Sequence, residues 1–311
     1  MFNKIIPIMT SITTASFKDY ISRLSSRMKE SGQFGTARNY VRAKNSFTRF
    51  LKSSQTGNTE IDEKLICAYS DYLIGLGLVR NTTSFYMRIL RSAYNKAVSE
   101  GLGEQTMPFR KVYTGVDTTR KRALNENDIR KLLKMNLHSD KRMELARDLF
   151  AFSYFTRGMS FVDMSFLKRK DADNGAITYI RRKTGQKMSI KSEPCIQKII
   201  SKYVTGKREY IFPLLTSTDP QKAYREYESA LSWYNRTLKS LALKSGIMEG
   251  LTSYVSRHSW ATSARDHHVS LSVISAGMGH TSEKTTRIYL TSMDNSEIDA
   301  ANRKLLVALD I

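Results

Sequence analysis

Cysteine is scarce in this chain of 311 residues, which contains only Cys67 and Cys195. This scarcity excludes a zinc site built from cysteine pairs and a disulfide-rich secreted scaffold. Long apolar runs are missing as well. No window approaches the roughly 18 consecutive apolar residues that a membrane-spanning helix requires. We therefore expect a cytoplasmic protein that does not enter a membrane.

Acidic residues are too few to balance the basic ones. Asp and Glu number 29 against 50 Lys and Arg, which gives a formal net charge of +21 and a pI near 9.9. A surplus of this size most often indicates a polyanionic partner, and nucleic acid is the first candidate. An anionic membrane surface would suit the same net charge, but the basic residues are spread through folded-looking segments and form no polybasic tail.

The first third of the chain carries a helical pattern. Apolar residues recur at helical spacing over residues 17–100, and glycine-containing loops divide this region into four helices. Asn81 is placed to cap the fourth of these helices. We predict an N-terminal helical domain over residues 1–105, with a core of its own.

The periodicity disappears over residues 106–123, a segment that holds Pro108, Gly115 and the basic run at 120–122. We interpret this segment as a basic interdomain linker. The basic run suits either a solvated loop or a contact with phosphate. Asn125 is placed to cap the first helix of a second domain over residues 124–311.

The second domain is predicted to be mainly helical, with one clear strand signal. Residues 176–182 and 187–191 alternate in polarity and flank a turn that contains Gly185, which predicts a β-hairpin. Residues 211–214 form another short extended candidate. Helices are predicted at residues 128–135, 142–155, 221–245, 253–267 and 270–276. The predicted fold class is therefore mainly α with a small β-sheet (α+β).

Five residues of this domain occur in an order that suits attack on a phosphodiester. They are Arg157 in YFTRGM, Lys183 in RRKTGQK, Arg257 in SYVSRHSWAT, His280 in MGH and Tyr289 in TTRIYL. Such a reaction needs the phosphate charge neutralised, the nucleophile aligned and the leaving oxygen protonated. Arginine suits the first task because its planar fork binds two phosphate oxygens and stays charged. Each of these residues alone is more often a surface or core residue, so the signal lies in their combined order.

These motifs resemble the catalytic domain of the tyrosine recombinases, also called phage integrases. The matching segments are YFTRGM, RRKTGQK, YVSRHSWAT and MGHTSEKTTRIY. The N-terminal four-helix region is similar in size and position to the core-binding domain of that family, which clamps DNA. The segments YVSRHSWAT and RGMSFVDM are particularly similar to integrases of the Bacteroides group.

The resemblance implies a role for each of the five residues. Tyr289 would be the nucleophile that forms a 3′-phosphotyrosine bond and releases a 5′-hydroxyl. Arg157 and Arg257 would clamp the phosphate, Lys183 would be the general acid, and His280 would assist.

The resemblance also implies partners and a location. It implies no metal or other cofactor, and double-stranded DNA as the partner. The protein would assemble as a homotetramer on paired DNA sites. It would lie in the cytoplasm, associated with the nucleoid, and an accessory protein that bends DNA is a possible further partner. The C-terminal segment would form an amphipathic tail helix that docks on a neighbouring protomer. Its apolar residues are Ile298, Leu305, Leu306 and Leu309.

Two positions depart from the family pattern. Tyr254 stands three residues before Arg257, where the family usually has histidine or lysine. A phenol has an ordinary pKa near 10 and is a poor base at neutral pH, so we expect activity with a slower proton transfer. Ser160 stands where the family tends to have an acidic residue, and Asp163 could support Arg157 only through a shifted register.

Two alternatives share much of this sequence evidence. One is a catalytically impaired, sequence-specific DNA-binding protein, and Tyr254 is the residue that points towards it. The other is a type IB topoisomerase-like enzyme, which uses the same chemistry without choosing a site.

Overall fold

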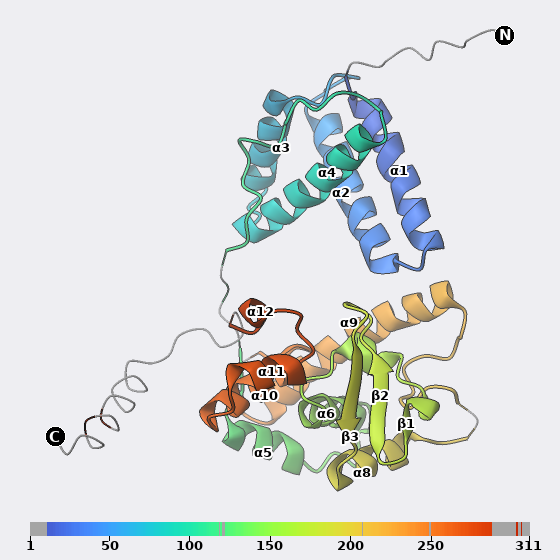
Figure 1. Cartoon of the computed structure of the whole chain (residues 1–311), viewed down its shortest axis with the longest axis vertical. Coiled ribbons are helices and arrows are strands. Elements are labelled where there is room, and N and C mark those ends of the chain that lie inside the picture. Colours follow the sequence, from blue (N-terminus) through green and yellow to red (C-terminus); the bar gives the residue numbers. More distant parts are fainter. Residues whose placement is uncertain are drawn as a thin grey trace. The chain divides into compact units, whose positions relative to one another are not determined.

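The computed structural model describes residues 11–117, 119, 122–206, 208–248, 250–287, 303 and 306. They belong to two compact units, Met1–Thr118 and Thr119–Ile311, and each unit has its own hydrophobic core (Figure 1). Helices dominate both units and a single small sheet accompanies them, which confirms the predicted fold class. Tyr289 lies outside the described residues, and so does the predicted tail helix apart from Arg303 and Leu306. No helix in the described part of the chain combines the length and apolarity that a bilayer span requires.

The first unit consists of the four predicted helices. They are α1 Thr14–Glu30, α2 Phe34–Ser53, α3 Glu63–Gly75 and α4 Arg80–Ser99. Aromatic rings from different helices meet in its core: Phe47 makes edge-on contacts with Phe17 and Tyr69. The buried Tyr69 hydroxyl donates to Ser46 at 2.8 Å, so its polar end is satisfied inside the core. Phe109, beyond α4, is also buried in this core.

The predicted cap of α4 is wrong. The N-cap is Val79, which makes no side-chain cap hydrogen bond. Both ends of the Asn81 amide are used elsewhere: Nδ2 donates to Asp117 O at 3.1 Å, and Oδ1 accepts from Asp117 N at 2.8 Å. The sequence pattern correctly indicated that the Asn81 side chain bonds to backbone groups. Those groups belong to Asp117, 36 residues further along the chain, and not to the first turn of α4.

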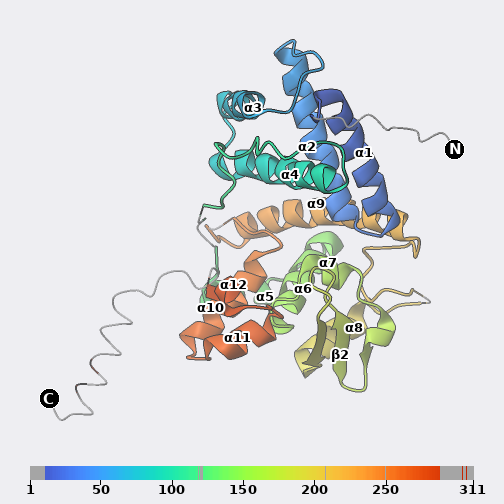
Figure 2. The same ribbon diagram turned by 45° about the horizontal axis from the view of Figure 1, so that its top comes forward.

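The second unit surrounds its core with helices on both sides of α6. They are α5 Glu126–Lys134, α6 Lys141–Phe155, α7 Phe161–Ser165, α8 Pro194–Tyr203, α9 Pro220–Lys244, α10 Val255–Asp266, α11 Leu271–Gly277 and α12 Glu283–Arg287, with the 3₁₀ turn η1 Arg169–Asp171. Figures 1 and 2 show α10 and α11 on one side of α6 and the sheet with α8 on the other. The Asn125 side chain accepts from Asp128 N at 2.8 Å, which confirms the predicted cap of α5.

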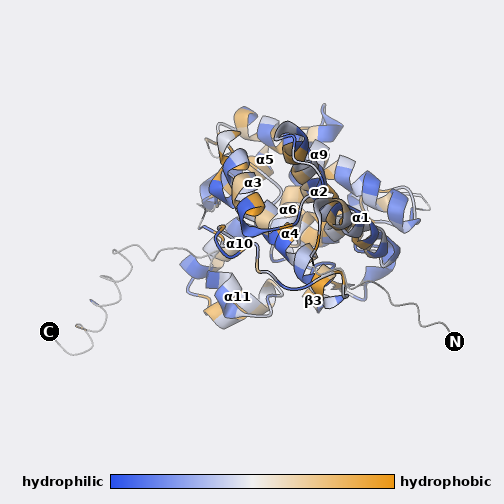
Figure 3. Cartoon of the chain, turned by 90° about the horizontal axis from the view of Figure 1, so that it is seen from above, coloured by the Kyte–Doolittle hydropathy of each residue, from blue (hydrophilic) through white to orange (hydrophobic). Residues whose placement is uncertain are grey.

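The sequence interpretation missed α7, α8 and α12. Two of these are single turns of five residues, too short to display a period. Helix α8 is longer, and its signal was present: Pro194 occupies the first turn, and Ile196 and Ile199 are buried at helical spacing. Figure 3 shows that hydrophilic and hydrophobic residues both occur along the helices of the chain.

The sheet is a three-stranded antiparallel meander in the order β1-β2-β3. Its strands are β1 Ala172–Asp173, β2 Ala176–Ile180 and β3 Lys187–Lys191. The predicted hairpin is confirmed, with Ile180 opposite Lys187 at the loop end. The extended segment predicted at 211–214 is wrong. Pairing is limited to one bridge between Tyr210 and Lys168, and the chain then turns at Pro213, with Leu214 N bonded to Phe212 O.

An ionic network fixes α8 against α6, the helix that leads to Arg157. Lys202 of α8 pairs with Glu144 at 2.7 Å and with Asp148 at 2.6 Å, and both carboxylates are buried. The hydrogen bond from Lys202 is the main cause that lowers the pKa of Glu144 to about 2. A buried carboxylate remains tolerable only while its cation is in place.

Lys202→Met should therefore lower the free energy of unfolding by about 3 kcal/mol, because two buried carboxylates lose the cation that they share. Urea denaturation at pH 7 measures the change. Lys198→Met on the exposed side of the same helix is the control and should stay within about 0.5 kcal/mol. Equal effects of the two substitutions would contradict a special role of the network.

Candidate active site

Small residues let α10 pack closely against α6. The hydroxyls of Ser153 on α6 and Ser256 on α10 are 2.7 Å apart, and Tyr154 donates to Ser263 at 3.1 Å. Ser256, Ser259 and Ala261 are fully buried. A helix face made of such residues brings the two backbones close together, so the first turn of α10 lies against the chain that leaves α6.

The chain leaves α6 through two successive left-handed residues. Arg157 has φ +59° and Gly158 has φ +74°. A Cβ at Gly158 would lie 2.7 Å from Arg257 Cγ and 2.9 Å from Arg257 Cα, so this position has no room for a side chain. Ser153 holds the far side of the turn by donating to Met159 O at 2.8 Å. The turn therefore brings Arg157 and Arg257 into the same region.

Arg257 is 4% exposed and joins three segments. Its Nη1 donates to Gly158 O at 2.6 Å, and its Nη2 donates to Met278 O at 2.7 Å. Nη2 also lies 2.9 Å from His280 Nε2. These three partners are neutral, and their dipoles help to solvate the buried positive charge.

His280 is the third member of this cluster, and its tautomer follows from its neighbours. Burial, reinforced by the charges of Arg257, Arg181 and Lys183, lowers the pKa of His280 from 6.5 to about 4. The ring is therefore neutral at pH 7. Because a guanidinium can only donate, Nε2 accepts from Arg257, and the proton is on Nδ1, 2.8 Å from Thr286 Oγ1.

These residues border a cavity of about 210 Å³. Its lining residues are Ser160, Val162, Arg181, Lys183, Thr184, Tyr254, Arg257, His280, Thr281 and Thr285. Cations and hydroxyls thus dominate the lining, and no carboxylate belongs to it among the described residues. Such a lining suits an anion that brings several acceptor oxygens.

The structure brings together four of the six residues singled out in the sequence. Lys183, Tyr254, Arg257 and His280 line the cavity. Arg157 is half-buried and does not belong to the lining; its Cδ lies 3.7 Å from the position of a Cβ built at Gly277. Tyr289 lies outside the described residues.

Tyr254 is the N-cap residue of α10 and is 49% exposed. Its ring lies 6.2 Å from the His258 ring, one turn further along the helix. Tyr254 therefore contributes a half-exposed phenol to the lining of the cavity.

Asp163 does not support Arg157. Among the described residues its buried carboxylate accepts from the Ser160 hydroxyl at 2.6 Å and from Arg182 N at 2.9 Å, and makes no ion pair with Arg157. The serine that replaces the family's usual acid thus caps α7, and Asp163 ties α7 to the end of β2.

Arg181 is a cavity residue that the sequence interpretation missed. It is 6% exposed and lies two residues before Lys183. The available signal was strand alternation: Ile177 is buried and Arg181 lies on the same face, whereas Arg182 is exposed. Within a run of basic residues the sequence provides no other reason to select it.

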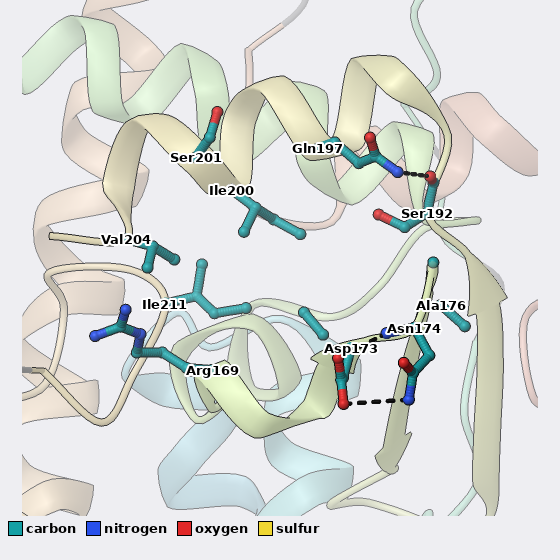
Figure 4. Close-up of a pocket in the computed structure, with 12 residues that line it drawn as sticks. Arg169, Asp173, Asn174, Ala176, Ser192, Gln197, Ile200, Ser201, Val204 and Ile211 are labelled. Carbon is teal, nitrogen blue, oxygen red and sulfur yellow. Dashed lines mark hydrogen bonds between the residues drawn. The ribbon is translucent and has the colours of Figure 1, made fainter.

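A roomier cavity of about 440 Å³ lies between α8, η1 and the β1–β2 turn. Figure 4 shows that polar groups of its lining are hydrogen-bonded to one another: Gln197 donates to Ser192 O, and Asp173 accepts from Asn174. Arg169 Nη1 donates a hydrogen bond to Gly206 O at 2.6 Å. This cavity contains none of the residues singled out above. In the described part of the chain, no group of three or more His, Cys, Asp or Glu residues could hold a metal ion.

Gly158→Ala should lower the free energy of unfolding by about 3 kcal/mol, because the new methyl group meets the Arg257 backbone in addition to the left-handed strain. Gly175→Ala is a matched control, since Gly175 has φ +73° and a Cβ placed there would meet nothing within 4 Å. It should cost about 1 kcal/mol from strain alone. Urea denaturation of both variants measures the difference, and equal losses would contradict the close approach.

The pKa of His280 predicts how stability depends on pH. Between pH 6.5 and 4 the unfolded chain binds a proton at His280 and the folded chain does not. The contribution of neutral His280 to stability is therefore complete above pH 6.5 and is lost as the pH falls towards 4. His280→Gln lacks this proton, so the gap in unfolding free energy between wild type and variant should shrink from pH 7.5 to pH 4.5. A gap that stays constant in urea denaturation would contradict the lowered pKa.

Comparison with known proteins identifies two domain families in the chain. Residues 16–112 match the phage integrase SAM-like domain, and residues 122–296 match the phage integrase family. No curated protein matches the chain.

Three solved structures share the fold. A lambda integrase dimer bound to a COC′ core site has a TM-score of 0.67 and 17% identity, covering 91% of this chain and 98% of the other. A lambda integrase tetramer bound to a Holliday junction has a TM-score of 0.65 and 18% identity, covering 90% and 78%. The Tn1549 transposon integrase in complex with transposon right end DNA has a TM-score of 0.65 and 15% identity, covering 94% and 99%.

The family match over residues 122–296 includes the whole cavity and the five-residue motif order, and the SAM-like match includes the four-helix unit. The chain therefore belongs to the phage integrase family.

Proposed function

We propose that this phage integrase breaks and rejoins DNA through a covalent bond to Tyr289. The protein is a site-specific tyrosine recombinase, an enzyme that acts on double-stranded DNA. The observation that supports this chemistry is the cavity in which buried Arg257 meets Lys183 and neutral His280 with no carboxylate among its described lining residues. A phosphodiester supplies the negative charge that this cavity lacks.

In the proposed reaction the Tyr289 oxygen attacks the scissile phosphorus, and the bond from phosphorus to the 5′-oxygen breaks. Arg257 and Arg157 stabilise the charge on the non-bridging oxygens, and neutral His280 holds Arg257 and donates no charge of its own. Lys183 gives its proton to the leaving 5′-oxygen. The 3′-phosphotyrosine keeps the energy of the phosphodiester, so a new 5′-hydroxyl can reverse the step.

The proton of Tyr289 has a less obvious acceptor. Tyr254 stands at the mouth of the cavity in place of a stronger base, and a phenol accepts a proton poorly at neutral pH. We propose that the proton leaves through a water molecule beside Tyr254, which makes nucleophile activation slower than it would be with histidine or lysine there.

The domain assignment and partners belong to the same proposal. Residues 1–105 form the core-binding domain, 106–123 a basic linker and 124–311 the catalytic domain. The enzyme acts in the cytoplasm on the nucleoid as a homotetramer on paired sites, with an accessory protein that bends DNA. We further propose that it is related to the integrases of the Bacteroides group, because its segments YVSRHSWAT and RGMSFVDM resemble theirs. A tail helix around Leu306 docks on a neighbouring protomer.

The test uses labelled duplexes that tile the DNA on both sides of the protein's own coding sequence. Wild type, Tyr289→Phe and Tyr254→Phe are incubated with each duplex and then denatured. Wild type should give a covalent protein–DNA band, and Tyr289→Phe should give none because the nucleophilic oxygen is gone. Tyr254→Phe should keep the band and form it more slowly.

Each other outcome selects a different function. A band that survives in Tyr289→Phe would disprove this nucleophile. Salt-sensitive binding without any band would support the catalytically impaired DNA-binding protein. Relaxation of plasmids that lack the mapped site would support the topoisomerase-like enzyme.

A further inference from the structure

Arg181 is a buried cation that the proposed reaction does not use. It follows the last residue of β2, and it is 6% exposed while its neighbours Arg182 and Lys183 are exposed. Its guanidinium crosses to the other side of the cavity and donates to Gly279 O. One side chain thus connects the hairpin that carries Lys183 with the turn that carries His280.

The turn packs directly on the base of the hairpin. Gly279 has φ +64°, and a Cβ built there would lie 2.7 Å from Met188 Sδ and 3.0 Å from Arg181 Cδ. Gln186 Oε1 would lie 3.3 Å away. The left-handed φ favours glycine at position 279, and the missing side chain lets the Met188 and Arg181 side chains lie against the turn.

The turn is anchored independently of the hairpin. Arg257 holds it through Met278 O, and His280 N donates to Ser275 O at 3.0 Å. Among the described residues, two backbone bonds close the hairpin loop: Arg181 N donates to Gln186 O and Gly185 N donates to Arg181 O, both at 2.8 Å. One bond ties the loop to α7, from Arg182 N to Asp163 at 2.9 Å. The contact from Arg181 to the turn adds a second tie, to a different segment, and so further restricts the position of the loop.

We propose that Arg181 is a positioning residue that docks the Lys183 loop on the Gly279–His280 turn, so that the Lys183 ammonium meets the leaving 5′-oxygen. This inference rests on the proposed function, in which Lys183 is the general acid. A lysine on an exposed loop has many rotamers, and a fixed loop base removes part of that freedom before the substrate binds. The buried charge of Arg181 also helps to keep His280 neutral.

The effect of losing Arg181 should pass through proton donation. On normal DNA the leaving group is a 5′-alkoxide, which needs a proton. In DNA with sulfur in place of the bridging 5′-oxygen, the P–S bond breaks and a thiolate leaves, which is stable without a proton. A variant that donates the proton poorly should therefore regain its cleavage rate on the sulfur-substituted DNA. A variant that binds the phosphate poorly should stay slow on both substrates.

The experiment measures single-turnover cleavage, at saturating protein, of the duplex that wild type cleaves in the adduct assay. Arg181→Met should be slower on normal DNA by about 100-fold, the scale of a misplaced catalytic group. On the sulfur-substituted duplex it should come within about threefold of wild type, as should Lys183→Ala. Arg257→Ala should stay slow on both duplexes, because it removes a phosphate contact.

Arg182→Met is the matched control, since the Arg182 side chain is exposed and lies over the Phe166 ring, 3.9 Å from its centroid. It should cleave normal DNA within about twofold of wild type. If Arg181→Met is equally slow on both duplexes, Arg181 acts on the phosphate or on folding, and the proposal is overturned. Wild-type rates on normal DNA would overturn it as well.

Hydrogen exchange without DNA separates this proposal from the proposed function. Amides of residues 183–188 and 278–281 should exchange faster in Arg181→Met than in wild type or Arg182→Met. If Arg181→Met does not fold, Arg181→Lys takes its place, because lysine keeps the charge but lacks the planar fork. It should also slow cleavage of normal DNA and speed hydrogen exchange in the loop and the turn. Unchanged exchange would overturn the docking. If wild type cleaves no duplex, the proposed function and the cleavage role of Arg181 both fail, and the exchange data still decide whether the loop docks.

Discussion

The buried guanidinium of Arg257 is the constraint on which the rest of the catalytic unit depends. It holds the chain after α6 through Gly158 O, the turn before α12 through Met278 O, and the His280 ring. Together with α10, which carries Arg257, the chain after α6 and the turn around Met278 and His280 thus make three segments joined by one charged group. The close fit of α10 against α6 lets that group reach the other two, and the serine contacts between these helices make the fit possible.

Much of the catalytic unit could be predicted from sequence because its signals are local. The hairpin around Gly185 is encoded by alternation and a turn residue, and the Asn125 cap by its own helix. The residues proposed for chemistry occur in short motifs, each of which places one side chain at the end of a helix or in a loop. The sequence also carries a signal for α8, in Pro194 and the spacing of its isoleucines. That signal is hard to recognise because the helix is short and begins soon after β3, whose apolar residues recur at every second position.

The rest depends on tertiary contacts that no local pattern encodes. Asn81 resembles a helix cap, but its amide binds the backbone at Asp117. Asp163 resembles a partner for Arg157, and yet it fastens α7 to the end of β2. Arg181 has the appearance of one surface charge in a basic run, and only the packing of Gly279 on the hairpin turns it inward. Sequence identifies these side chains as polar, while the fold decides which polar partner each one obtains.

The concentration of like charge around the cavity has a consequence for the resting protein. Arg181 and Arg257 are buried, Lys183 is close by, and the described lining supplies no counter-charge. Like charges held this close together oppose folding, and the electrostatic field that they produce favours binding of an anion. Like-charge repulsion in the free protein is relieved when a polyanion enters, so binding and conformational stability are coupled through the same side chains. Selection for heat resistance alone would therefore favour an Asp or Glu in this lining. Such a carboxylate would stabilise the fold, but it would also repel a phosphate.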